Sequence, residues 1–551
     1  MKQYTLVALD VTGIQGYIFN SNRLKENIGA SELVYRVTRQ WVFDEVPTPN
    51  NVTANGLDDN LRIEAGNIVA EVIYAGGGNA FILFVEAAAA EQFISELSLK
   101  IISEAPGLEL VAATVPFDWD TQPLGDPDEG QMKAVVETLT KNKRTRTASV
   151  PLLGLGVTAA CQSTGLPAVY LEPDEGYPIS AQVRAKIDSA DEATQRLQET
   201  LGAVIEAYEI PKKFDELGRQ RGESSYIAVV HADGNSISKT LQRISEDYDE
   251  AGDDGNRAFI NAIRTFSEKL ERASKNALEA MIEILVAAID ESEEGQKGIG
   301  DTVFLVDNYL PCRPIVFGGD DVTFVCDGRL GLSLAACYLY AFEQETKKEG
   351  LNCQACAGVA VVKSHYPFAR AYQLSEALAG SAKKYVRDNG DGFSALDWHF
   401  AETGLLGDLN DIRRREYEWP DPNSSNSTNG AYQLYMRPIR LHAHAQTWRT
   451  WPNFVNVIHG FNTSDAENES LNWAGKRNKI MGLYQALREG SVSVRQFRTA
   501  YGLATLPEMS AAPDRLAHDG WDGKTCGYFD PIEALDFFVT LNGQEVQNGT
   551  V

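Results

Sequence analysis

The hydrophobic positions along the chain predict one order of elements twice: a strand, a helical segment, a strand hairpin, a helix and a strand. In the first occurrence, short apolar runs mark the strands, and apolar spacings of three and four residues mark the helices. The predicted elements are a strand over 5–10, a helical segment over 13–43, strands over 68–75 and 80–85, a helix over 87–102 and a strand over 108–117. The glycine-rich stretch GGGN, at 76–79, joins the two hairpin strands as a tight turn.

The same order returns from about residue 224, and a further helix and strand follow it. The predicted elements are a strand over 225–233, a long helix over 257–291, strands over 314–317 and 322–328, a helix over 330–350, a strand over 356–362, a helix over 367–390 and a strand over 394–400. Here the hairpin turn reads GGDD, at 318–321. Both occurrences match the ferredoxin-like order β–α–β-hairpin–α–β, which makes the fold class α+β.

Local sequence similarity supports a duplication. LVALDVTGI aligns with AVVHADGNSI, and VIYAGGGNAFILF aligns with PIVFGGDDVTFVC. In this alignment Asp10 matches Asp233, and Gly78–Asn79 matches Asp320–Asp321. We therefore expect two homologous domains, of which the first has lost its hairpin carboxylates.

Four regions follow from these patterns. Residues 1–149 form the first repeat, 150–222 a partly helical connector, 223–400 the second repeat and 401–551 a mainly helical C-terminal domain. A length of 551 residues agrees with three or four domains.

Composition narrows the class of protein. The chain is 43% hydrophobic and lacks any apolar stretch of 18 residues, so we expect no membrane span. It begins directly with a strand pattern instead of a signal peptide, which predicts a cytoplasmic protein. The net charge of −27 argues against broad binding of a nucleic-acid backbone. The one dense basic run is either a solvated helix end or a local basic groove; it contains Lys141, Lys143, Arg144 and Arg146.

The seven cysteines fit a reducing compartment, because they are scattered and odd in number. Cys353 and Cys356 form a single CxxC at the start of a predicted strand, and Cys161 stands alone. Without a second pair nearby, this arrangement does not predict a zinc site.

Three carboxylates are the candidate chemistry of the second repeat. Asp233 ends its first strand, and Asp320 and Asp321 lie in the hairpin turn; in a ferredoxin-like sheet these strands are neighbours. Oxygen ligands of this kind suit Mg²⁺ or Mn²⁺. The alternative is that GGDD is an exposed turn and that Asp233 caps one.

Residues around the carboxylates suggest nucleotide binding. Gly318 and Gly319 would let a nucleotide approach the backbone. Lys383, near the end of the helix over 367–390, could bind a triphosphate, whereas Lys383 and Lys384 could also be a solvated helix end.

These motifs resemble the palm domain of GGDEF diguanylate cyclases, class III nucleotide cyclases and, most of all, the large polymerase-palm subunit of type III CRISPR effectors. The resemblance rests on LDVTGIQGYIF, NRLKENIGASELV and YAGGGN in the first repeat, and on HADGNSI, FGGDDVTF and Ala382–Lys383 in the second. It covers roughly 1–400, and the C-terminal region resembles the last domain of that subunit.

The resemblance implies two palm domains and the conversion of ATP into cyclic oligoadenylates. It implies Asp233, Asp320 and Asp321 as catalytic metal ligands, with Mg²⁺ or Mn²⁺ as the cofactor. The nucleotide-binding residues it implies are Gly318, Gly319, Lys383, Asn235 and Ser236 in the second repeat, and Gly76, Gly77, Gly78 and Ser31, for a second nucleotide, in the first. For Ser31 the alternative is a packed helix residue.

The sequence also departs from that family. No HD pair precedes the first repeat, so single-stranded DNA cleavage is not expected. The connector keeps one cysteine, Cys161 in CQSTGLPA, where the family commonly carries a cysteine-ligated zinc. The protein is then either a subunit of an RNA-guided complex or a stand-alone cyclase that signals to a nucleotide-sensing effector. Two alternatives stay open: a catalytically silent scaffold that binds nucleotide or RNA, and a GGDEF-like cyclase that uses another nucleoside triphosphate.

Overall fold

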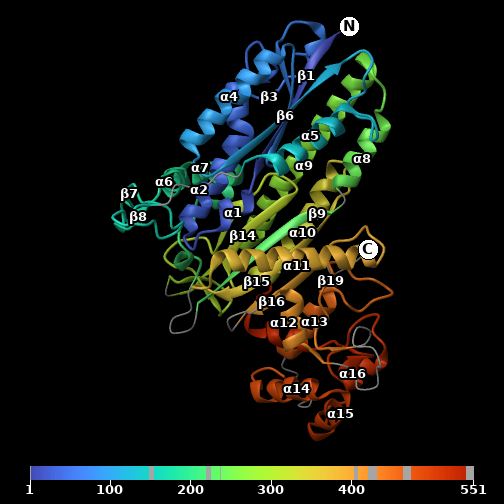
Figure 1. Ribbon diagram of the computed structural model, residues 1–551. Coiled ribbons are helices and arrows are strands. Elements are labelled where there is room, and N and C mark those ends of the chain that lie inside the picture. Colours follow the sequence, from blue (N-terminus) through green and yellow to red (C-terminus); the bar gives the residue numbers. More distant parts are fainter. Residues whose placement is uncertain are drawn as a thin grey trace.

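The computed structural model describes residues 2–147, 154–218, 225–235, 237–293, 295–401, 407–419, 431–462 and 473–541. The molecule is elongated, with the sheet of the first repeat at one end, the sheet of the second repeat in the middle and the residues after 407 at the other end (Figure 1). No helix in these ranges is both long and apolar enough to cross a bilayer.

The first repeat forms a four-stranded antiparallel sheet in the order β4-β5-β1-β6. Its strands are β1 (Gln3–Thr12), β4 (Ala70–Gly76), β5 (Asn79–Phe84) and β6 (Glu109–Asp118). Its helices are α1 (Ile14–Phe19), α2 (Leu24–Tyr35), the π-helix η1 (Arg36–Gln40), α3 (Trp41–Glu45), α4 (Ala87–Glu104) and α5 (Gln131–Thr145). Short elements between α3 and β4 are β2 (Val52–Thr53), β3 (Gly56–Leu57) and the 3-10 turn η2 (Ile63–Ala65).

Alternation of side chains along β1 gives its sheet two buried faces. Val7 and Leu9 join the core that holds α2 and α4, whereas Leu6 and Ala8 join the core that holds α5. This order is the predicted ferredoxin-like one, and α5 covers the second face as an added helix.

The second repeat forms a six-stranded sheet in the order β13-β14-β9-β15-β16-β19. Its strands are β9 (Tyr226–Asn235), β13 (Cys312–Val316), β14 (Asp321–Asp327), β15 (Gln354–Lys363), β16 (Ala395–Ala401) and β19 (Ile439–Arg440). Its helices are α8 (Ile237–Asp247), α9 (Gly252–Ala287), α10 (Gly331–Lys348) and α11 (Phe368–Asp388). A small sheet after α9 contains β10 (Asp290–Glu291), β11 (Lys297–Ile299) and β12 (Val303–Phe304).

The first four strands of this sheet repeat the order of the first sheet, which confirms the α+β duplication. β16 then pairs parallel to β15, and β19 from beyond residue 401 pairs with β16. Helix α9 covers 252–287, not the predicted 257–291. Asp253 and Asp254 in its first turn favour the earlier start, because carboxylates stabilise the positive end of the helix dipole.

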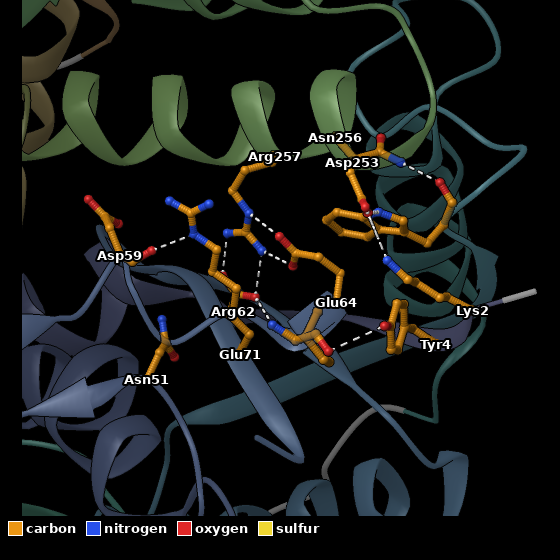
Figure 2. Close-up of polar contacts among 12 residues, drawn as sticks. Lys2, Tyr4, Asn51, Asp59, Arg62, Glu64, Glu71, Asp253, Asn256 and Arg257 are labelled. Carbon is orange, nitrogen blue, oxygen red and sulfur yellow. Dashed lines mark hydrogen bonds and ion pairs between the residues drawn. The ribbon is translucent and has the colours of Figure 1, made fainter. Parts of the chain in front are cut away.

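The two repeats pack against each other, and two of their contacts involve helices α11 and α9 of the second repeat. Phe19 of α1 stacks on Tyr372 of α11, with ring centroids 3.7 Å apart. Helix α9 of the second repeat lies against the first repeat, where Arg257 and Arg264 pair with the fully buried Glu71 of β4. Figure 2 shows the part of this second contact around Arg257, Glu64 and Glu71. A helix of the second repeat therefore belongs to the packing of the first.

The connector and the C-terminal region complete the chain. The connector contains β7 (Tyr170–Leu171), β8 (Pro178–Ile179), α6 (Ala181–Asp188), α7 (Ala190–Leu201) and the 3-10 turns η3 (Gly202–Ile205) and η4 (Phe214–Glu216). The C-terminal helices are α12 (Leu409–Glu416), α13 (Trp451–Asn462), α14 (Arg477–Glu489), α15 (Ser491–Ala500), α16 (Asp514–Asp519), α17 (Phe529–Glu533) and the 3-10 turn η6 (Ala534–Asp536). A small sheet lies among them, formed by β17 (Glu418–Trp419), β18 (Tyr432–Gln433), β20 (Trp521–Asp522) and β21 (Thr525–Cys526).

Candidate active site

The three candidate carboxylates come together where β9 meets the β13–β14 hairpin. Asp321 is the register partner of Asp233 on the neighbouring strand. The N–H of Gly234 donates to the carbonyl oxygen of Asp320 over 2.9 Å, which fixes the turn beside the end of β9. A side chain at position 234 would place its Cβ 3.2 Å from the Cβ of Asp320, which is a tight contact, so glycine favours this close approach. The turn itself requires glycine at 318, where φ is +104°.

Lys383 of α11 supplies the positive charge at this point. Its Nζ lies 2.5 Å from Oδ2 of Asp233 and donates to the carbonyl oxygen of Gly234 over 3.1 Å. Lys384 is exposed on the same helix, as expected for a solvated position. The structure thus places Lys383, the lysine that the sequence favoured, beside the carboxylates and leaves Lys384 in solvent.

The carboxylates of the turn carry more negative charge than Lys383 compensates. Burial and the charge of Asp233 raise the pKa of Asp320. Burial, together with the charges of Asp320 and Asp233, raises the pKa of Asp321 to about 7. Both shifts favour protonation of the free carboxyls or the binding of a cation.

The donor set is suited to a hard divalent cation, although the side chains are not yet arranged around one. Within the described ranges, no three His, Cys, Asp or Glu side chains are grouped closely enough to hold a metal ion. One reason is that an oxygen of Asp233 is paired with Lys383. The all-oxygen donors and the uncompensated charge of Asp320 and Asp321 nevertheless fit Mg²⁺ or Mn²⁺. These three residues are the ones that would hold the ion.

The first repeat has an equivalent of the Asp–Lys pair but not of the hairpin carboxylates. Asp10 faces Asn79 across β1 and β5, as Asp233 faces Asp321. Lys143 of α5 forms an ion pair with Asp10, as Lys383 of α11 does with Asp233. Within the basic run, Lys143 therefore pairs with a partly buried carboxylate of its own repeat.

A cavity of 920 Å³ connects the two hairpin turns. Gly76, Gly77 and Gly78 of the first repeat line it together with Gly318, Gly319 and Asp321 of the second, and the buried Ser31 also lines it. A Cβ on Gly78 would lie 2.8 Å from Cδ1 of Ile14, so a larger residue would push into this wall. The cavity brings together the predicted glycines of both repeats.

Asn235 and Cys161, which the sequence also singled out, make packing contacts. Asn235 donates from Nδ2 to Sγ of the buried Cys356 over 3.1 Å, which is a packing contact at the end of β9. Ser236 lies outside the described residues. Cys161 is buried in a small core with Ile179, Val183 and Ile187, so apolar packing holds the connector there.

The sequence did not reveal the charged residues of the cavity wall. Arg39 comes from η1, Arg196 from α7, and Glu271 and Lys275 from α9. The Arg196 guanidinium lies 4.2 Å from the ring centroid of Tyr35 and 4.5 Å from that of Phe317. In the sequence, each of these residues is only a polar position within a helical segment, so no spacing pattern distinguished it from its neighbours.

The raised pKa of Asp321 predicts a pH dependence of stability in metal-free solution. Asp321 keeps its proton up to about pH 7 in the folded protein, but only up to about pH 4 in the unfolded chain. Protonation of Asp321 therefore favours the folded state, and its contribution to the free energy of unfolding falls as pH rises from about 4 to about 7. Asparagine does not titrate, so Asp321→Asn lacks this pH-dependent contribution. We expect the free energy of unfolding of the variant minus that of the original protein to increase over this interval, by an amount on the order of 1–3 kcal/mol.

Urea unfolding of both proteins in EDTA, at pH 5 and pH 8, measures this difference. The same difference at both pH values would contradict the raised pKa. Excess Mg²⁺ should stabilise the original protein more at pH 8 than at pH 5, because protons compete with the cation at low pH.

Comparisons with known proteins agree with this geometry. Residues 226–390 match the family model of the Cas10/Cmr2 second palm domain. No curated protein sequence matches the chain. Among solved structures, the chain is similar to a Csm1–Csm4 cassette in complex with AMPPNP, at 14% identity and a TM-score of 0.52, over 97% of this chain and 70% of that one.

Two further structures have the same fold. Csm1 of T. onnurineus matches at 12% identity and a TM-score of 0.51, over 98% of this chain and 70% of that one. A Csm1–Csm4 cassette in complex with pppApApA matches at 13% identity and a TM-score of 0.50, over 97% and 69% of the two chains. The similarity therefore extends over both repeats and the C-terminal region.

Proposed function

We propose that this chain, of which residues 226–390 match the Cas10/Cmr2 second palm domain, is a large polymerase-palm subunit of the type III CRISPR kind and a nucleotidyltransferase that links and cyclises ATP into oligoadenylate messengers. The observation that supports the proposal most is the pairing of Asp233 with Asp321, next to Asp320, beside a cavity that also contains the glycine turn of the first repeat. An arrangement with carboxylates on one side and a bare glycine turn on the other suits two nucleotides with different roles.

The residues of the second palm would position the nucleotide that is attacked. Gly318 and Gly319 expose the backbone of the turn, so that the phosphates can lie against it. Lys383, released from Asp233, would neutralise phosphate charge. A divalent cation held by Asp233, Asp320 and Asp321 would stabilise the charge on the α-phosphate and on the departing pyrophosphate and would acidify the attacking hydroxyl.

The residues of the first palm would hold the nucleotide that attacks. Its 3′-hydroxyl forms a bond to the α-phosphorus of the other nucleotide, the bond from that phosphorus to the pyrophosphate oxygen breaks, and the hydroxyl proton leaves to solvent or a nearby base. Gly76–Gly78 and Ser31 would keep this nucleotide in the shared cavity. Holding both reactants in one cavity makes the step effectively intramolecular, which is the main catalytic contribution here.

Similar structures support the choice of substrate and the presence of a partner. The cassettes reported above were solved with AMPPNP and with pppApApA, which are adenine nucleotides. The same cassettes pair Csm1 with Csm4, so we propose that this chain also assembles with a further subunit of an RNA-guided complex. A nucleotide-sensing effector would then receive the product.

The test is to incubate the purified protein with ATP, GTP, CTP or UTP and with Mg²⁺ or Mn²⁺, and to identify products by mass spectrometry. We expect pyrophosphate and linear or cyclic oligoadenylates from ATP, and loss of both products in EDTA. Products from GTP instead of ATP would assign a different cyclase. No turnover of any nucleotide, with or without co-purified guide RNA, partner subunits and target RNA, would leave the protein a scaffold and overturn the proposal.

A further inference from the structure

A carboxylate lies between two cations in the wall of the shared cavity. Nη1 of Arg39 donates to Oε2 of Glu271 over 2.7 Å, and Nζ of Lys275 donates to Oε1 of the same carboxylate over 2.7 Å. Arg39 comes from η1 of the first palm, whereas Glu271 and Lys275 lie one turn apart on α9 of the second. The ion triad Arg39–Glu271–Lys275 therefore joins the two palms across the cavity.

The position of the triad links it to the hairpin turn. A Cβ on Gly318 would lie 3.6 Å from Cε of Lys275, so the end of the lysine side chain lies close to Gly318 of the GGDD turn. All three residues also line a second cavity, of 420 Å³, that continues past α9 toward Tyr74. The triad stands at the junction of the two cavities, with a lysine side chain 39% exposed and a carboxylate 22% exposed.

Among the charged residues that line the 920 Å³ cavity, Arg39 and Lys275 are the best placed to bind an anion. Glu199, Glu279 and Asp321 line the same space and repel an anion. Arg196 is engaged by Glu32, whose Oε2 accepts from its Nε over 2.8 Å, while its guanidinium packs on Tyr35 and Phe317. Arg39 and Lys275 share a single carboxylate between two positive charges, and both cations line the cavity.

The charge state of Glu271 follows from its neighbours. Burial acts to raise its pKa, but the charges of Arg39 and Lys275 outweigh burial and lower it. Glu271 is therefore ionised at neutral pH and masks both cations. A triphosphate, which has more negative charge and several acceptor oxygens, competes with it for the same two partners.

We propose that Arg39 and Lys275 bind the triphosphate of the nucleotide held by the first palm, and that Glu271 occupies them until this nucleotide arrives. The assignment rests on the proposed function, because it takes the ligand to be a nucleoside triphosphate. Binding would replace one intramolecular carboxylate by phosphate oxygens that contact both palms at once. The triphosphate would then fix the distance between the two glycine turns at the moment when the second nucleotide enters.

Binding measurements in the absence of turnover test this assignment. Isothermal titration in EDTA, with ATP, inorganic tripolyphosphate and adenosine as probes, separates phosphate contacts from base contacts. Arg39→Ala and Lys275→Ala should each weaken the binding of ATP and tripolyphosphate about tenfold, because each removes a charge-assisted contact. Neither should change the binding of adenosine.

The opposite change gives a sharper result. Glu271→Gln removes the competing charge but keeps the size of the side chain, so ATP and tripolyphosphate should bind several-fold more tightly. A misfolded variant would not produce a gain in affinity. Lys269→Ala is the matched control, because Lys269 lies on the same helix and lines neither of the two cavities.

The outcomes separate this inference from the proposed function. Unchanged affinity for ATP and tripolyphosphate in both Arg39→Ala and Lys275→Ala, or weaker binding in Glu271→Gln, would overturn the inference even if the protein makes oligoadenylates. Failure to make any oligonucleotide would overturn the proposed function, while the tripolyphosphate measurements would still decide whether the triad is an anion site.

Discussion

Replacing Asp320 and Asp321 together by alanine is expected to lower the rate of oligoadenylate formation from ATP by about 1000-fold or more. The two substitutions remove both carboxylates of the turn and leave Asp233 paired with Lys383, so no group of oxygens remains to hold a cation at the α-phosphate. The rate of pyrophosphate release with saturating ATP and Mg²⁺ measures the effect.

Position-matched controls make this result specific to the second palm. Asn79 of the first palm occupies the register position opposite Asp10 that Asp321 occupies opposite Asp233. Asn79→Ala should therefore lower the rate by less than about tenfold, because no charge is lost there. The isosteric pair Asp320→Asn and Asp321→Asn keeps the shape of the turn and should be as inactive as the alanine pair. Equal turnover in the original protein and the double variant would remove the carboxylates from the mechanism.

The second large effect concerns stability and the contact between α9 and the first palm. Replacing Glu71 by alanine is expected to lower the free energy of unfolding by about 3–5 kcal/mol, because it leaves two buried guanidinium groups without their shared carboxylate. Glu71 accepts from Arg257 and Arg264, and also from the backbone N–H of Ile63 over 2.9 Å. Urea unfolding followed by tryptophan fluorescence measures the change, because Trp119 lies in the core that α9 shares with the first palm.

Asp59→Ala is the control for this prediction. Its carboxylate pairs with the same Arg264 at 2.9 Å, but its side chain is 61% exposed, so its removal should cost less than about 1 kcal/mol. If Glu71→Ala and Asp59→Ala lowered the free energy of unfolding by similar amounts, burial would not determine how strongly these ion pairs stabilise the protein. Because α9 also supplies Glu271 and Lys275, we expect Glu71→Ala to weaken ATP binding as well.

Much of the fold followed from local patterns. Apolar runs and helical spacings are properties of ten or so neighbouring residues, and they predicted both hairpins and the order of strands in the two sheets. The match of Asp10 with Asp233, and of Asn79 with Asp321, was also predicted, since a duplicated frame fixes register. The sequence predicted a resemblance to that family on the same residues, and residues 226–390 match the model of the Cas10/Cmr2 second palm domain.

Other features depended on contacts between distant parts of the chain. The parallel pairing of β16 and the addition of β19 could not be predicted, because an edge strand of two residues has no pattern of its own. The small sheet among the C-terminal helices was missed for the same reason. The ion pair of Lys143 with Asp10 was hidden in a basic run that looked like a solvated helix end.

The sequence by itself determined the two palms, their hairpin turns and the three carboxylates of the second, because strands, turns and duplicated motifs are encoded by neighbouring residues. Only the tertiary structure decided that both turns line one cavity and that Arg39 meets Glu271 and Lys275 there. Arg39 and Glu271 are separated by 232 positions. A polar residue on a helix surface shows no preference for a partner until packing brings the two palms together.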